Sequence, residues 1–315
     1  MKPKGGTELQ HAFLEEHVDK KLLDNFQICT SIPGKVPLSS DKINIMWQKN
    51  SFNQKNLNAW FSNKSNHEKY DWYIFNSHWN YEKFRYAFDL PTERCHVIKN
   101  GVVNCNDKYG ERQVYKKGDL VRLVFQPTPW RGLNVLLAAM QYLKDENVLL
   151  DVYSSCEVYG DDFKKANDSK WVPLYEQANK LKNVNYIGYR PNDFILKKMP
   201  FYHLFAYPSI FEETSCISAL ECMAAGVYCI VTNYGALYET CSEFPVYVTF
   251  ETDYNKLAYS FAMAIKGAIN SLHEDYIQEH LQVQRNFVNR FYSWDKKGME
   301  WNSFLQGALN GKRPK

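Results

Sequence analysis

Short apolar runs of strand length alternate along the chain with longer segments whose apolar residues recur at helical spacing. The strand-like runs fall in two blocks, at 26–32, 42–48, 72–77 and 95–102, and then at 120–126, 148–155, 184–189, 203–208 and 227–233. Helical spacing is clearest over 9–23, 78–88, 133–143, 161–181, 193–199, 254–271, 274–290 and 295–309. Two such blocks predict an α/β protein with two domains, each built on a parallel sheet.

The polar, turn-rich stretch 104–119 lies between the two blocks and has the composition of an interdomain linker. A chain of 315 residues is long enough for two domains with a substantial core. We therefore expect an N-terminal domain at 1–103 and a second domain at 104–292.

Composition narrows the class of protein. A net charge of +3 with 23% charged residues does not indicate nucleic acid or an anionic membrane as a partner. The N-terminus has no apolar signal-peptide core, and the longest apolar run, 217–231, contains Glu221 and is too short to span a bilayer. The eight cysteines form no CxxC pair and lie mostly in apolar runs, which favours buried free thiols and a cytoplasmic location over a zinc site.

The chain is organised around Pro208–Gly226, PSIFEETSCISALECMAAG. The pattern predicts a loop after a strand and then a helix that ends at Gly226, with Glu213 in the loop and Glu221 about two turns into the helix. The unpaired backbone N–H groups at a helix N-terminus suit a phosphate. Two carboxylates on either side of such a seat fit a ligand with phosphate in its middle and hydroxyls at both ends, as in a nucleotide sugar.

Several other loops follow predicted strands and could line the same cleft, because ligands of parallel sheets bind at the carboxyl ends of the strands. These loops are 127–132, the serine pair 154–155 and 188–190. Gly5 and Gly6 precede the first helix, where they either let the backbone approach a ligand or form a flexible start. The absence of GxGxxG and Walker sequences argues against dehydrogenases and P-loop enzymes.

The stretch PSIFEETSCISALECMAAG resembles the signature of retaining glycosyltransferases of family 4, which have the GT-B fold. GGTE, NSHWNYEKF, CHVIKNGV and RGLNVLLAAM are similar to further segments of that family, and YSWDKKGMEWNSFL is similar to its closing segment. The resemblance implies two Rossmann-like parallel-sheet domains facing a cleft. It also implies a C-terminal helix, here 293–315, that crosses back to pack on the N-terminal domain.

The resemblance also implies roles for individual residues. Glu221 would bind the ribose of the donor, and Glu213 the hydroxyls of the transferred sugar. The diphosphate would be held by a side chain and by backbone amides, namely Arg131 with Ser215, Cys216 and Ile217. Tyr189 and Arg190 would lie near the base, and Gly6 would approach the donor from the other domain. No metal ion is expected, because cationic and backbone groups would stabilise the leaving diphosphate.

Three features depart from the family pattern. Gln126 stands where the family usually has an arginine for the phosphates, and Lys49 stands where it has a histidine. Lys49 and Glu213 are nevertheless the candidate catalytic residues. The first strand of the N-terminal domain is not found before the glycine loop, so the edge of that sheet would be completed differently, for example in a homo-oligomer.

For individual residues, alternatives stay open on sequence alone. Glu212 could replace Glu213 after a one-residue slip, Arg131 could be a surface charge, and Lys49 could be the solvated end of a strand. Glu221 is not expected to be a solvated carboxylate on a helix surface. Its predicted helix is rich in Ala, Met and Cys, and a carboxylate among apolar positions needs a partner.

The expected function is transfer of a hexose from a nucleotide-diphosphate sugar, by default UDP-glucose, to an acceptor that the sequence does not identify. The alternative is a catalytically weak nucleotide-sugar-binding protein, and a GT-B-type epimerase ranks below both.

Overall fold

The computed structural model describes residues 5–103 and 108–311, which form two compact units. The larger unit consists mainly of Val102–Glu212 and Cys216–Arg290. The smaller unit consists of Gly6–Gly101, the short segment Glu213–Ser215 and the chain from Phe291 onward. Each unit is an α/β structure with its own parallel sheet, as the alternation of apolar runs predicts.

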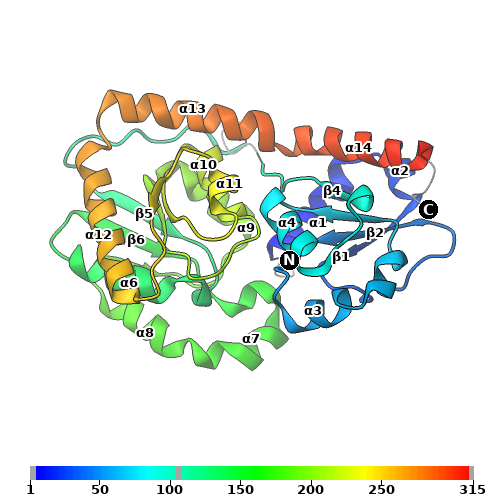
Figure 1. Ribbon diagram of the computed structural model, residues 1–315. Coiled ribbons are helices and arrows are strands. Elements are labelled where there is room, and N and C mark those ends of the chain that lie inside the picture. The colour runs from blue at the N-terminus through cyan, green and yellow to red at the C-terminus, as the bar shows by residue number, and fades with distance from the viewer. Residues whose placement is uncertain (1–4, 104–107, 312–315) are drawn as a thin grey trace. The chain divides into compact units, whose positions relative to one another are not determined.

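The larger unit contains a six-stranded sheet with the order β10-β9-β8-β5-β6-β7, in which every pair is parallel (Figure 1). Its strands are β5 (Val121–Phe125), β6 (Val148–Val152), β7 (Val184–Tyr186), β8 (Leu204–Tyr207), β9 (Tyr228–Thr232) and β10 (Val246–Val248). Strands β5 and β8 are fully buried except for Arg122, which explains their continuous apolar runs.

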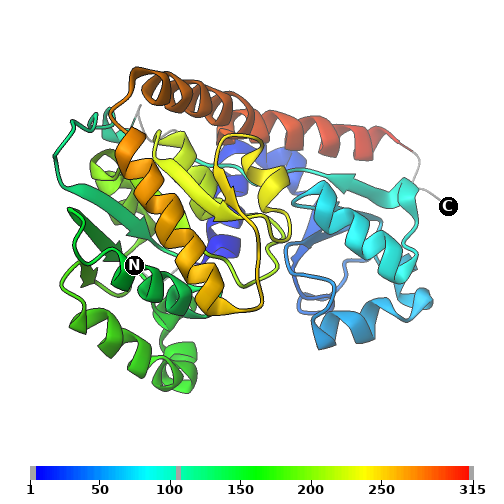
Figure 2. The same cartoon turned by 60° about the vertical axis from the view of Figure 1, so that its left-hand side comes forward.

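Helices connect these strands, and two more follow the last strand, β10. They are α6 (Leu133–Tyr142), α7 (Asp161–Asn167), α8 (Val172–Lys180), α9 (Asn192–Lys198), α10 (Ile217–Ala224), α11 (Leu237–Cys241), α12 (Tyr254–Ser271) and α13 (Asp275–Tyr292). Helix α12 packs against α6, and the two can be followed in Figures 1 and 2. The buried residues of α12 recur at helical spacing, from Leu257 to Ala268.

The smaller unit contains a four-stranded parallel sheet whose strands follow sequence order. The strands are β1 (Phe26–Thr30), β2 (Ile43–Gln48), β3 (Trp72–Phe75) and β4 (Cys95–Val97). The helices are α1 (Gly6–His17), α2 (Lys20–Leu23), α3 (Lys55–Phe61), α4 (His78–Phe88) and α14 (Trp294–Asn310).

The C-terminal helix α14 packs on this four-stranded sheet, as the family resemblance predicts. Trp301 of α14 meets Trp47 of β2 edge to face, with ring centroids 4.9 Å apart. Trp294, Leu305 and Ala308 join the same buried cluster. Edge-to-face aromatic pairs add about 0.5–1.5 kcal/mol to the burial of their area, so this contact anchors the helix.

The differences from the sequence-based prediction concern short elements and two predicted helices that are divided, 9–23 into α1 and α2 and 161–181 into α7 and α8. Strand β10 and helix α11 were not predicted, because three and five residues respectively are too few to show a period. Helix α3 was missed because its seven residues, KNLNAWF, cover too few turns to show a helical period. Glu221 is the fifth residue of α10, which begins at Ile217, so it lies one turn into the helix and not two.

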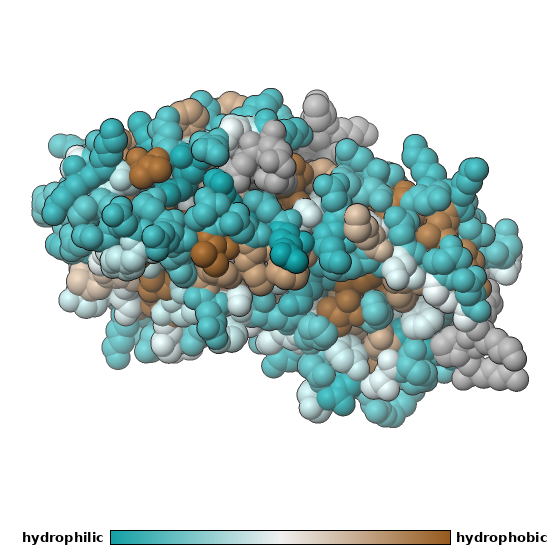
Figure 3. All heavy atoms as spheres, turned by 90° about the horizontal axis from the view of Figure 1, so that it is seen from above, coloured by the Kyte–Doolittle hydropathy of each residue, from teal (hydrophilic) through white to brown (hydrophobic). Residues whose placement is uncertain are grey.

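No helix in the described part of the chain is both long enough and apolar enough to cross a membrane. The view in Figure 3, from the side that α13 occupies in Figure 1, is mostly hydrophilic with small, separate apolar groups. None of the seven cysteines within residues 5–103 and 108–311 forms a disulfide bond, and only Cys95 is not buried. Cys105 lies outside the described residues.

Candidate donor and acceptor sites

The loop after β8 is fixed by Ser209, the second residue of Pro208–Gly226. The Ser209 hydroxyl donates to the carbonyl of Phe211 (2.8 Å), and the Ser209 carbonyl accepts from the hydroxyl of Thr232 at the end of β9 (3.0 Å). Because Ser209 is fully buried, these bonds set the direction in which the chain leaves the sheet.

Gly132 allows the loop after β5 to approach the loop after β8. Its φ is +112°, and a Cβ there would lie 2.0 Å from the carbonyl oxygen of Pro208, so only glycine fits. The neighbouring Arg131 places its guanidinium carbon 4.2 Å from the centre of the Phe211 ring. Arg131 is therefore half-buried against Phe211, and is not a plain surface charge.

Glu221 is a buried carboxylate with neutral partners. Its Oε1 accepts from Asn192 Nδ2 at the start of α9 (2.8 Å), and its Oε2 accepts from Gln126 Nε2 after β5 (3.3 Å). Burial raises the pKa of Glu221 to about 7, although the hydrogen bonds from Asn192 and Gln126 lower it. The carboxylate is therefore held at the meeting point of β5, α9 and α10 without a cation among its hydrogen-bond partners.

The N-terminus of α10 lies on the chain between the two predicted glutamates. The N-cap residue Cys216 makes no side-chain cap hydrogen bond to the first turn. The amides of this turn are therefore not capped by their own N-cap side chain, as an anion seat requires. At the other end, Gly226 has φ +75° and follows the C-cap Ala225, which confirms the predicted glycine stop.

In the smaller unit, buried polar residues follow the strands at the carboxyl edge of the sheet. They are Ser31 after β1, Lys49 after β2, Asn76 and Ser77 after β3, and Asn100 after β4. Parallel strands bring their carboxyl ends to one edge, so these residues form one polar region. Ser31 has φ +66°, an uncommon conformation for a non-glycine residue and a place where backbone strain is stored.

Lys49 lies at the centre of this region. Its Nζ donates to Asn100 Oδ1 (2.8 Å) and lies 3.6 Å from the centre of the Trp47 ring. Burial holds the pKa of the Lys49 ammonium well below its usual range. Lys49 is 9% exposed, so the alternative of a solvated strand end is wrong.

The segment Glu213–Ser215 is tied to the same region. Thr214 Oγ1 donates to the carbonyl of Lys49 (2.7 Å) and accepts from Asn76 Nδ2 (3.1 Å), while Ser77 Oγ donates to the carbonyl of Thr214 (2.6 Å). These bonds make the segment part of the smaller unit. Glu213 is 3% exposed there.

The predicted site residues therefore divide between the units. The larger unit holds Arg131, Tyr189, Arg190, Cys216, Ile217 and Glu221, whereas the smaller unit holds Gly6, Lys49, Glu213 and Ser215. Gly6 is the first residue of α1. Arg190 is exposed and donates to the carbonyl of Tyr189 (2.7 Å).

Sequence reasoning missed the residues that hold the predicted ones. Asn192, Thr214 and Asn100 were not singled out, although each bonds directly to Glu221 or Lys49. Asn100 precedes a glycine and was assigned to turn chemistry, and Asn192 lies just outside the predicted helix 193–199. Ser77 carried a usable signal, since it directly precedes a helix and caps it through the amide of Asn80 (2.9 Å).

No group of three or more His, Cys, Asp or Glu side chains within the described ranges could hold a metal ion. Metal-independent chemistry stays a prediction.

Two α/β units, each with a parallel sheet, and a C-terminal helix packed on the first sheet are the features of the GT-B fold, and the neighbours among solved structures have this fold. The chain belongs to the family described as "Glycosyl transferases group 1", whose sequence profile matches residues 111–281, more than half of the chain. No match was found among curated proteins.

Three solved structures illustrate the likeness in fold. A glycosyltransferase from Rickettsia africae ESF-5 is 14% identical, with a TM-score of 0.66 over 98% of this chain and 83% of its own. Sucrose-phosphate synthase from Thermosynechococcus elongatus is 15% identical, with a TM-score of 0.66 over 86% and 69%. Anabaena Alr3699/HepE in complex with UDP-glucose is 17% identical, with a TM-score of 0.61 over 85% and 72%.

Proposed function

We propose that the chain is a retaining, metal-independent glycosyltransferase of family 4. It moves a hexose from a nucleotide-diphosphate sugar, with UDP-glucose as the default donor, to an acceptor of unassigned class. The observation that carries the proposal is Glu221, a buried carboxylate held by two amides one turn into α10. A buried carboxylate raises the free energy of the folded chain, so its presence calls for a ligand that uses it. HepE, a relative in fold, was solved with UDP-glucose.

In this proposal the larger unit binds the donor nucleotide. Glu221 accepts hydrogen bonds from the ribose hydroxyls, and Tyr189 and Arg190 lie beside the base. When the bond between the anomeric carbon and the diphosphate breaks, its electron pair moves to the diphosphate oxygen. An acceptor hydroxyl oxygen bonds to the anomeric carbon, and its proton passes to the leaving diphosphate. Arg131 and the amides at the start of α10 stabilise the charge that develops there, and removing one such donor typically costs about 10²–10³ in turnover.

The smaller unit supplies the groups for the transferred sugar and the acceptor. Glu213 binds sugar hydroxyls, and the hydrogen bonds of Thr214 fix the backbone beside it. Lys49 takes the place of the histidine expected from the family. Its burial against Trp47 and Asn100 keeps the Nζ position fixed, as a group that touches a reacting sugar requires.

Nucleotide release from a panel of nucleotide sugars tests the proposal. The wild-type chain is expected to release nucleotide, and Glu221→Ala is expected to abolish most of that release. Glu251→Ala, an exposed glutamate of the same unit, is the matched control and should behave as wild type. NMR of the transferred sugar tests retention, because an inverted anomeric centre would contradict it.

A second candidate is a catalytically weak nucleotide-sugar-binding protein. Gln126 favours it, because its amide bonds Glu221 where the family pattern has an arginine for the phosphates. Arg131 is then the one side-chain cation assigned to the diphosphate. Donor binding without nucleotide release across many acceptors would support this candidate over the enzyme.

A further inference from the structure

The larger unit contains a pocket that none of the assigned roles uses. It has a volume of about 420 Å³, within the range of about 300–1,000 Å³ that small-molecule sites occupy. It lies between the loop after β5, the start of α6 and the start of α8. Its lining residues are Trp130, Asn134, Lys170, Trp171, Pro173, Leu174, Gln177 and Ile210.

Aromatic faces form one side of the pocket. The rings of Trp130 and Trp171 have centroids 5.9 Å apart and planes inclined at 42°, and both side chains are partly exposed. Tyr159 stacks on Trp130 with an interplanar angle of 18°, and Phe163 packs against both. This packing holds Trp130 in place, so the aromatic surface exists before any ligand binds.

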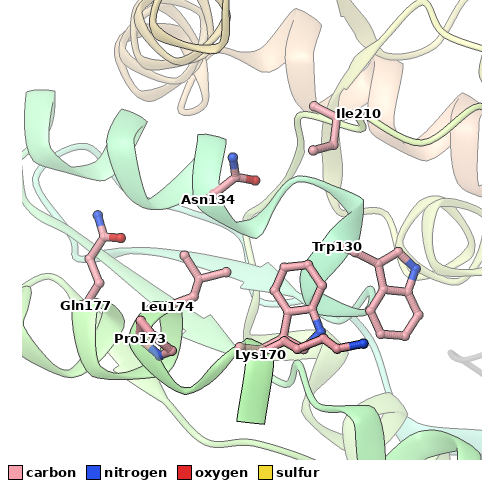
Figure 4. A pocket seen from close by; sticks show the side chains of 8 residues that line it. Trp130, Asn134, Lys170, Pro173, Leu174, Gln177 and Ile210 are labelled. Carbon is pink, nitrogen blue, oxygen red and sulfur yellow. The ribbon is translucent and has the colours of Figure 1, made fainter. Parts of the chain in front are cut away.

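Three polar side chains and three apolar residues complete the lining. Throughout residues 5–103 and 108–311, Asn134 and Gln177 find no side-chain hydrogen-bond partner, and Lys170 forms no ion pair. Figure 4 shows Trp130 and Lys170 at one end of the pocket and Gln177 at the other, with Asn134 on α6 between them. Two amides and one exposed ammonium thus line an aromatic pocket and are available to hydrogen-bond a ligand in place of solvent.

We propose that this pocket binds a saccharide unit. A pyranose ring has apolar C–H faces that pack on an indole and a rim of hydroxyls that both donate and accept, as Asn and Gln amides do. Two indoles inclined at 42° cannot both stack on a flat nucleobase, and one lysine is a poor match for a diphosphate. The preference for a saccharide over another amphipathic ligand rests on the proposed function.

Two residues of the pocket are neighbours in sequence of residues at the proposed donor site. Trp130 precedes Arg131, and Ile210 precedes Phe211, the ring on which Arg131 lies. A saccharide bound here would therefore contact the two loops that position Arg131. We infer that the pocket holds part of a glycan acceptor or product and so increases affinity for oligosaccharides over single sugars.

Titration of the full chain with neutral oligosaccharides tests the proposal, with tryptophan fluorescence and calorimetry as readouts. The probes are maltotetraose, cellotetraose, chitotetraose and mannotetraose, with decaproline as a peptide probe. At least one saccharide is expected to bind. Asn134→Ala and Gln177→Ala should each weaken binding about threefold to tenfold, as for one hydrogen bond, and Trp171→Ala about tenfold or more.

Glu176→Ala is the control, because Glu176 is an exposed neighbour of Gln177 on α8 outside the pocket. Absence of saccharide binding, binding that the amide variants leave unchanged, or binding of decaproline alone would overturn the proposal. Binding of nucleotide sugars by the wild-type chain, measured with the same panel as in the release assay, separates the two claims. Donor binding without saccharide binding refutes only the pocket, whereas saccharide binding without donor binding refutes only the proposed function.

Discussion

Replacing Glu221 by glutamine should stabilise the folded chain while weakening the donor site. Glutamine has the shape of glutamate but no charge, so the variant removes the cost of burying a carboxylate. The pKa of about 7 in the folded chain, against an ordinary 4.5, corresponds to roughly 3 kcal/mol at about 1.36 kcal/mol per pH unit. One of the two amides that face Glu221 must rotate to accept from the new NH₂ group, which lowers the expected gain to about 1–3 kcal/mol.

The gain should depend on pH with a definite sign. Between pH 4.5 and about 7 the folded chain keeps a proton on Glu221 that the unfolded chain has released. The stability that Glu221 contributes is therefore fully present below pH 4.5 and is lost as the pH rises through 7. Urea denaturation of the wild type and Glu221→Gln should give similar stabilities at low pH and diverge towards pH 8. An equal difference at both ends of the range would refute the burial argument.

Three further predictions concern neighbouring groups. Gln126→Arg should place a cation beside Glu221, lower its pKa, and shift the pH dependence of nucleotide release to more acidic pH. Gly132→Ala should destabilise the larger unit by about 3 kcal/mol or more in urea denaturation, because its Cβ would meet a backbone carbonyl at 2.0 Å. Gly267→Ala, in open space within α12, is the matched control and should stabilise by about 0.5–1 kcal/mol. Lys49→Met should change stability by less than about 1 kcal/mol but lower turnover, since the ammonium is buried without a carboxylate partner in the described chain. A loss of turnover that is explained by the loss of folded protein would contradict a role of Lys49 in turnover.

The fold could be predicted because long elements carry their own period. Helices α4 and α12 have the predicted bounds, 78–88 and 254–271, since their buried residues repeat at helical spacing. Strands β5 and β8 of the larger sheet were found because burial on both faces makes them continuous apolar runs. Strand β10, with three residues, has no such signal.

The site was predictable only in part. In Pro208–Gly226, the proline, the glycine and the spacing of the carboxylates predicted a loop and then a helix that carries Glu221. This prediction succeeded because a loop and a helix end depend on residues close in sequence. The partners of Glu221 and Lys49 come from distant strands and loops, so no local spacing encodes them. Asn192 is 29 residues from Glu221, and Asn100 is 51 residues from Lys49. Tertiary folding alone brings these amides to the charged groups.

Calorimetric titration of UDP-glucose into the wild type, Glu221→Ala and the control Glu251→Ala tests the central claim most directly. If Glu221 binds the donor, the wild type and the control should bind with equal affinity. Glu221→Ala should bind about 10-fold to 100-fold more weakly, as for the loss of hydrogen bonds to a charged group. Equal affinity in all three chains would contradict the assignment of this carboxylate to the donor site.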